Sequence, residues 1–266
     1  MAKSLTSQTE LNRIFSRMRR QYNELSRKQQ AQAIREIGRV RADTADLLAE
    51  FANKDGTISQ RRLRRLLQDM DSIESEMRRN GERALFGIVE DTAEWTTRKI
   101  RAIPGVTLSS SQFDHINRHV FRYVVDRFGD DNLVLSERIW GLSGEIRDEL
   151  TSVIRTGVIR GDGINAMVPR IREVYDTETW KIRRMARTES LTAHRASISY
   201  NAQASDIVEW VQFHEGNDRS PACTALANED KYGKGRGVYK PGDTEIWMPH
   251  PNCTSYITYI LDERWL

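Results

Sequence analysis

The sequence changes character at residues 207–213, which read Ile-Val-Glu-Trp-Val-Gln-Phe. Apolar and polar residues alternate there with a period of two, which is typical of a half-buried β-strand. Residues 245–248 and 256–261 are two further strand candidates. Three short strands can form a small antiparallel sheet against which a preceding helix packs. The sequence therefore predicts a small sheet module over residues 207–266.

The sequence before this module is predicted to be helical almost throughout. Near its start, apolar residues recur at alternating spacings of four and three, which indicates a narrow apolar seam on a helix. The seam begins with Leu11, Phe15, Met18, Tyr22 and Leu25, and it is then interrupted by Gln29, Gln30 and Gln32. A seam this narrow packs on one partner helix. A coiled coil between subunits and an antiparallel hairpin within the chain fit equally well.

Further helices are predicted at about 112–128, 136–159, 164–175 and 178–205. The fold class is thus mostly α with a small C-terminal α+β module, in which a long helical body precedes a short antiparallel sheet. We divide the chain into an extended helical body at 1–135, with a basic N-terminal arm, and a second domain at 136–266. The second domain combines helices over 136–205 with the sheet module.

The charge of the whole chain is nearly balanced, with 41 basic and 38 acidic side chains and a formal net charge of +3. This balance does not require a nucleic-acid partner. Residues 1–41, however, carry ten Lys and Arg against three Glu. Such an arm suits DNA phosphates, an acidic protein face or simply a solvated helix face. The candidates for nucleic-acid binding are Arg13, Arg17, Arg19 and Arg20.

The expected compartment follows from what the sequence lacks. No stretch approaches the roughly eighteen apolar residues of a membrane span, and the first fifteen residues lack the apolar core of a signal peptide. Two cysteines are too few for a scaffold built on disulfides. We therefore expect a protein that is made and folded in a reducing cytoplasm, with no membrane partner.

The sharpest local motif is His250-Pro251-Asn252-Cys253, with Cys223 thirty residues earlier. Two thiolates and an imidazole are three of the four ligands that zinc usually takes. Two prolines flank His250 and stiffen the loop that carries it. Cys223, His250 and Cys253 are therefore the candidate metal ligands.

The fourth ligand of such a site is not evident. Leu226 stands where a C-x-x-C pair would have its second cysteine, and Ser255 stands where a C-x-C pair would have it. The remaining candidates are His214, Asp218 and Asp243. We therefore expect two free or weakly paired structural cysteines and no cofactor, with zinc as the alternative.

The same motif allows an enzymatic interpretation. A Cys–His pair acts as a nucleophile when an ion-paired imidazole lowers the pKa of the thiol. The spacing of His250 and Cys253 across proline does not ensure that their side chains meet, and no oxyanion motif is evident. No catalytic residue is predicted. A metal-dependent nuclease or transferase centred on His250 and Cys253 remains the alternative function.

Arg187-Thr188-Glu189 lies within the last predicted helix. Residues two apart on a helix do not face each other, so Arg187 and Glu189 must contact different neighbours. A buried charge without a partner costs several kcal/mol. We therefore expect these two side chains to fasten the helix to the C-terminal sheet.

Four segments occur in an order that resembles a known family. They are Met185–Glu189, the strand that carries Trp210, the stretch from Asp218 to Cys223, and Pro249–Cys253. Together they resemble the head-morphogenesis domain of the Mu F-like minor head proteins of phages, and the resemblance covers roughly residues 140–262. Arg187, Thr188 and Glu189 match the family's Arg-Thr-Glu. Cys223 matches its first cysteine, and His250 and Cys253 match its His-Pro-x-Cys end. Leu226 and Ser255 depart from the family pattern, which often has further cysteines there.

The resemblance implies a minor capsid protein of a tailed bacteriophage, present in few copies in the virion. Its expected place is the head interior or the portal region, after assembly in the host cytoplasm. Its expected partners are the portal protein and other capsid proteins. Some members of the family bind DNA or influence its packaging or delivery. Because the sequence contains no base-reading motif, contact with double-stranded DNA would be independent of base sequence.

Overall fold

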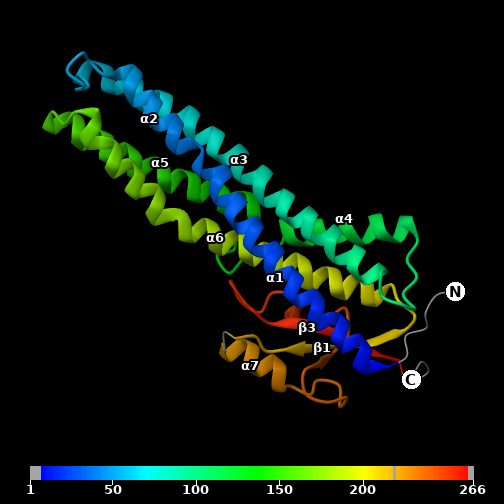
Figure 1. Cartoon of the computed structure of the whole chain (residues 1–266). Helices are drawn as coiled ribbons and strands as arrows, with labels where there is room; N and C mark the ends of the chain where they lie inside the picture. Colours follow the sequence, from blue (N-terminus) through cyan, green and yellow to red (C-terminus); the bar gives the residue numbers. More distant parts are fainter. Residues whose placement is uncertain (1–6, 218–219, 263–266) are drawn as a thin grey trace. The chain divides into compact units, whose positions relative to one another are not determined.

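A computed structural model of the chain describes residues 7–217 and 220–262. The six long helices are α1 (Gln8–Gly38), α2 (Val40–Phe51), α3 (Gln60–Arg101), α4 (Ser110–Asp126), α5 (Leu135–Arg160) and α6 (Ile164–Gln203) (Figure 1). The C-terminal elements are β1 (Val208–His214), α7 (Pro221–Asn228), β2 (Val238–Tyr239), the 3-10 turn η1 (Thr244–Ile246) and β3 (Tyr256–Leu261). The predicted fold class, mostly α with a small C-terminal antiparallel sheet, is confirmed. None of the described helices has the length and apolar character that a membrane crossing needs.

The contacts within the chain divide it into two compact units. The first unit consists of the chain up to Gln29, residues 86–130 and the chain from Arg184 onward, and the second consists of residues 30–85 and 131–183. The helices α1, α3 and α6 each contribute a segment to both units. The borders of these units along the chain fall after Gln29, Leu85, Asp130 and Arg183, and the predicted division after residue 135 stays a prediction. Because α1, α3 and α6 each contribute to both units, the units do not follow one another along the chain.

The apolar seam of α1 forms part of the core of the first unit. Leu11, Phe15, Met18 and Tyr22 are buried, and Leu25 is half-buried. The partner of the seam lies in the same chain, because the ring of Phe15 meets that of Tyr259 in β3 at a centroid distance of 4.8 Å.

The predicted interruption of the seam at Gln29 is wrong. Gln29 is itself buried, and its Nε2 donates to Thr92 Oγ1 at 2.9 Å while its Oε1 accepts from Ser190 Oγ at 2.8 Å. A buried glutamine keeps its place in a core when its amide is hydrogen-bonded, so the buried stripe of α1 continues through it. Gln30 is half-buried and Gln32 is exposed.

The second unit joins its helices through tight turns. Gly161 ends α5 with a left-handed φ of 75°, and Gly56 has a φ of 78° in the turn before α3. These two turns meet, since Thr57 and Gly163 form an antiparallel bridge. Gly157 allows a close approach to Met167, because a Cβ there would lie 2.5 Å from Met167 Sδ.

The helix α6 is continuous, so the predicted break between residues 175 and 178 is wrong. The polar residues that suggested the break are compatible with the helix. Thr179 donates its hydroxyl to Tyr175 O at 3.0 Å, and Glu178 pairs with Lys181 at 2.6 Å one turn later. Hydrogen bonds of this kind satisfy polar side chains without interrupting the backbone ladder.

The C-terminal sheet has the strand order β2-β1-β3, and both pairings are antiparallel. The strands predicted at 207–213 and 256–261 are confirmed as β1 and β3. The strand predicted at 245–248 is wrong, since this segment contains η1 and the third strand is the two-residue β2. Ile246 and Trp247 are neighbours and both are buried. A strand would place them on opposite faces, whereas a turn buries both on one side.

Candidate functional site

The predicted fastening residues lie in the half of α6 that belongs to the first unit. Glu189 is fully buried, and its Oε2 accepts from the guanidinium of Arg127, after α4, at 2.7 Å. One partner of Glu189 is thus the end of another helix. Arg187 is half-buried.

Thr188 connects the Arg-Thr-Glu segment of α6 with the His-Pro-Asn-Cys segment before β3. Its Oγ1 accepts from the backbone N–H of Asn252 at 2.9 Å and donates to Arg184 O at 2.8 Å. Asn252 adopts a left-handed φ of 61° in the loop before β3. The Arg-Thr-Glu segment and the His-Pro-Asn-Cys segment are therefore in direct contact, although 64 residues separate Thr188 from Asn252.

The arginine that binds the C-terminal segment is Arg195, which the sequence analysis did not single out. Its side chain is 1% exposed. Its Nε donates to Trp247 O at 2.6 Å and its Nη1 to Ser255 O at 3.0 Å. The sequence holds one signal for it, because no other Lys, Arg, Asp or Glu occurs between Glu189 and Asp206. A charge in such a segment must have hydrogen-bond partners in the fold.

The three candidate metal ligands form one cluster. Cys223 Sγ lies 3.2 Å from His250 Nε2 and 3.4 Å from Cys253 Sγ. All three ligand atoms lie within 4.8 Å of one another. Both cysteines are buried and free, and His250 is half-buried. The fold thus brings Cys223, from the first turn of α7, to the loop that carries His250 and Cys253.

Hydrogen bonds fix the orientation of the cluster. His250 Nδ1 donates to Pro251 O at 2.9 Å, so the neutral imidazole leaves Nε2 as an acceptor that faces Cys223. Ser255 donates its hydroxyl to Cys223 Sγ at 3.0 Å and its backbone N–H to Cys253 Sγ at 3.4 Å. Burial raises the pKa of the Cys223 thiol. This is the opposite of the lowered pKa that a nucleophilic cysteine needs.

The other ligands that the sequence offered lie elsewhere or outside the described residues. His214 donates or accepts a hydrogen bond at 2.8 Å with Thr258 Oγ1 and stacks on Tyr256. Asp243 binds Lys231 at 3.2 Å. Asp218 is outside the residues that the structure describes. Among those residues, the metal-ligating cluster comprises Cys223, His250 and Cys253.

Trp210, the remaining predicted motif residue, is half-buried on β1. Its ring lies against Tyr232 at a centroid distance of 5.4 Å, and the ammonium of Lys234 lies 5.8 Å from its ring centroid. Its role is therefore to hold the loop between α7 and β2 against the sheet.

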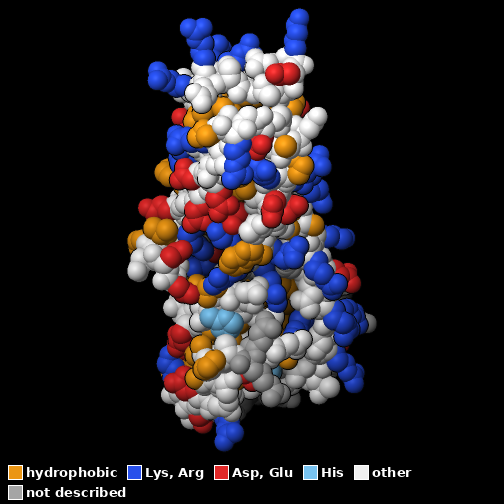
Figure 2. Space-filling view, turned by 90° about the vertical axis from the view of Figure 1, so that its left-hand side faces the viewer, with side chains coloured by type: hydrophobic (Ala, Val, Ile, Leu, Met, Phe, Trp, Pro, Cys, Tyr) orange, Lys and Arg blue, Asp and Glu red, His pale blue; other side chains and the backbone are white. Residues whose placement is uncertain are grey.

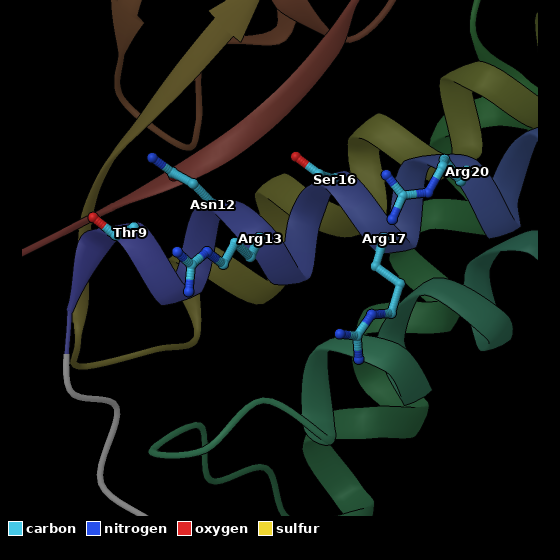
Figure 3. Close-up of a pocket in the computed structure, with 6 residues that line it drawn as sticks. All are labelled: Thr9, Asn12, Arg13, Ser16, Arg17 and Arg20. Atoms are coloured by element: carbon cyan, nitrogen blue, oxygen red, sulfur yellow. The ribbon is translucent and has the colours of Figure 1, made fainter.

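The predicted basic residues divide into two groups. Arg13, Arg17 and Arg20 line an open cleft of about 430 Å³ on α1, together with Thr9, Asn12 and Ser16 (Figure 3). Arg19 points to the C-terminal sheet instead, and its guanidinium carbon lies 3.9 Å from the ring centroid of Tyr256. The face shown in Figure 2 mixes Lys and Arg with Asp and Glu, so basic charge is not general over that face.

A buried polar layer of the first unit was not found by sequence reasoning. His194 is 4% exposed, accepts or donates a hydrogen bond at 2.8 Å with Thr96 Oγ1, and stacks on Tyr22 at 4.1 Å. Burial, and to a smaller extent the charge of Arg195, lowers the pKa of His194 to about 3. The imidazole is therefore neutral in the folded chain at any pH near neutrality.

Comparisons of the chain with protein-family models, with curated proteins and with solved structures find no match.

Proposed function

We propose that this chain is a minor capsid protein that assists head morphogenesis in a tailed bacteriophage. It acts by docking and not by turning over a substrate. The observation that carries this proposal is the contact between Thr188 and Asn252, because it joins two of the segments on which the resemblance to the Mu F-like proteins rests. Segments that were grouped only by their order in the sequence thus belong to one packed site.

The proposed place of the chain is the head interior or the portal region of the virion, and its proposed partners are the portal protein and other capsid proteins. Docking requires apolar side chains that the folded chain leaves in solvent. Ile159 in α5 is 71% exposed and Trp180 in α6 is 53% exposed. Trp140 is also exposed, but its indole already donates to Glu82 at 2.6 Å. Phe128 is 68% exposed but belongs to the first unit, whereas Ile159 and Trp180 both belong to the second. We assign Ile159 and Trp180 as the anchors of the portal contact.

The proposed contact with DNA lies at the cleft on α1. Three guanidinium groups, from Arg13, Arg17 and Arg20, reach one open surface. Guanidinium groups bind phosphates without reading bases, so this contact would be independent of base sequence. Three charges give weak binding, which suffices where DNA is as concentrated as it is in a packed head. Contact of this strength suits a role in packaging or delivery of the genome.

The test is to locate the chain in its own phage. An affinity-tagged chain should co-purify with assembling heads and mature particles, in far fewer copies than the major capsid protein. A double variant, Ile159→Ser with Trp180→Ser, should fold normally and be lost from the particles. Arg183→Ser, an exposed residue of the same helix, serves as the control and should be retained. Absence of the wild-type chain from both heads and particles would refute the proposal.

The enzymatic alternative is favoured by one observation, the 3.2 Å contact between Cys223 Sγ and His250 Nε2. A metal-dependent nuclease at this cluster would nick plasmid DNA in the presence of a divalent metal. The purified chain and His250→Ala should be compared in that assay. Nicking that requires His250 would replace the docking proposal with the enzymatic one.

A further inference from the structure

We propose that Cys223, His250 and Cys253 bind one Zn²⁺ ion as a structural site. This inference is independent of the proposed phage function, because it rests on the geometry of three side chains. It also goes beyond the sequence, which supplied the residue types but could not show that the side chains meet.

The positions of the three ligand atoms fit a zinc ion. Cys223 Sγ is 3.2 Å from His250 Nε2 and 3.4 Å from Cys253 Sγ, and no pair in the cluster exceeds 4.8 Å. A point equidistant from three such atoms lies about 1.9–2.4 Å from each, which is the range of Zn–N and Zn–S bonds. The sulfur atoms are much farther apart than the roughly 2.05 Å of a disulfide. The cluster thus has the dimensions of a metal site.

The hydrogen bonds around the cluster are those that a zinc site uses. His250 Nδ1 donates to the carbonyl of Pro251 at 2.9 Å, which directs the free lone pair of Nε2 at Cys223. Histidine ligands of metals are commonly fixed in this way by a carbonyl on the other ring nitrogen. Ser255 donates to both sulfur atoms, through its hydroxyl to Cys223 and its backbone N–H to Cys253. Such donors stabilise the negative charge of thiolates.

Sulfur and imidazole ligands select zinc over the harder ions magnesium and calcium. On binding, each thiol loses its proton to solvent, and two thiolates then balance the charge of one Zn²⁺ ion. A neutral site suits Cys223 and Cys253, which are both buried. Three protein ligands would leave one tetrahedral position for a ligand from solvent such as water.

The ion would cross-link two segments of the first unit. Cys223 belongs to α7, whereas His250 and Cys253 belong to the loop before β3. That loop is already bound to α6 through Asn252 and Ser255. Zinc would therefore fasten α7 to the loop that binds α6.

The experiment is a titration of the reduced, metal-free full chain with Co²⁺, a spectroscopic substitute for zinc. Tetrahedral thiolate coordination gives visible ligand-field bands and a near-ultraviolet sulfur-to-cobalt band. Both should saturate at one Co²⁺ per chain and disappear when Zn²⁺ is added. In Cys253→Ser, the sulfur-to-cobalt band should no longer saturate at one Co²⁺ per chain. The control is His119→Asn, which breaks the His115 and His119 pair on α4, whose rings lie 4.1 Å apart, and it should leave the spectrum unchanged.

A second measurement uses the wild-type chain and does not depend on the folding of a variant. Alkylation of Cys223 and Cys253 should become at least tenfold slower when one equivalent of Zn²⁺ is present. Unchanged alkylation rates would overturn the proposal. So would a cobalt spectrum without thiolate bands, or binding that survives in Cys253→Ser and is lost in His119→Asn.

Discussion

The buried histidine of α6 makes the stability of the fold depend on pH. His194 is 4% exposed, stacks on Tyr22 and shares a hydrogen bond with Thr96. Burial, and to a smaller extent the charge of Arg195, lowers its pKa from 6.5 to about 3. Below pH 6.5 the His194 imidazole therefore becomes protonated in the unfolded chain but stays neutral in the folded chain. The free energy of unfolding must fall as the pH falls from 6.5 towards 3.

The size of the effect follows from the two pKa values. A difference of 3.5 units, from 6.5 to about 3, corresponds to about 5 kcal/mol once the pH is below both values. Most of the pH range between these two pKa values overlaps the titration of carboxylates. Between pH 7.5 and pH 5.5 the histidine alone should remove about 1 kcal/mol from the free energy of unfolding, and few carboxylates titrate there.

The measurement is urea unfolding at pH 7.5 and pH 5.5 for the wild type and His194→Gln. Glutamine does not titrate and can keep a hydrogen bond to Thr96. The pH-dependent loss should therefore be about 1 kcal/mol smaller in the variant than in the wild type. The burial of His214 also lowers its pKa, but this contribution is common to both proteins and cancels. Gln32→Ala, an exposed control on α1 that adds or removes no titrating group, should lose as much as the wild type. Equal losses in wild type and His194→Gln would show that His194 is not held neutral by the fold.

Two further predictions concern charged side chains. Glu189→Ala leaves Arg127 buried without its carboxylate, so the free energy of unfolding should fall by about 3–5 kcal/mol; thermal or urea unfolding checks it, and Glu94→Ala, which breaks an exposed pair, should cost less than about 1 kcal/mol. A loss of the same size in both variants would contradict the assignment. The last prediction concerns the triple replacement by glutamine of Arg13, Arg17 and Arg20. Its slope of log K against log salt, measured with duplex DNA, should be shallower by up to about 2.7, whereas Arg27→Gln on the same helix should lose less than about 1. An unchanged slope in the triple variant would remove the cleft from the DNA contact.

Local patterns sufficed for much of the fold. The alternation at residues 207–213 predicted β1, and the four-three spacing from Leu11 to Tyr22 predicted the buried stripe of α1. Each pattern arises within a single element that has one buried face and one exposed face. The same reasoning failed at residues 245–248, because a short apolar run has no unique period. It also missed β2, whose two residues are too few for any periodicity.

The candidate site was predictable in its residue types but not in its geometry. Cysteine and histidine near proline indicated a metal-binding chemistry, yet thirty residues separate Cys223 from Cys253. Only the packing of α7 against the loop before β3 determines the 3.4 Å between their sulfur atoms. Arg195 shows the same limit. Its residue type predicts that it needs partners when buried, but its acceptors are backbone carbonyls of Trp247 and Ser255, which no side-chain pattern reveals.

The buried polar residues explain how one arrangement of long helices is selected. An apolar seam tolerates a slip by one helical turn, since it would still meet apolar residues. A slip of α6 against α1 and α3 would instead separate Ser190 from Gln29 and His194 from Thr96. Each buried polar group left without a partner costs about 1–3 kcal/mol. Apolar burial therefore drives the helices together, and the polar layer fixes their register. Because Thr188 and Arg195 belong to the same stretch of α6, that register also determines where the loop carrying His250 and Cys253 is held.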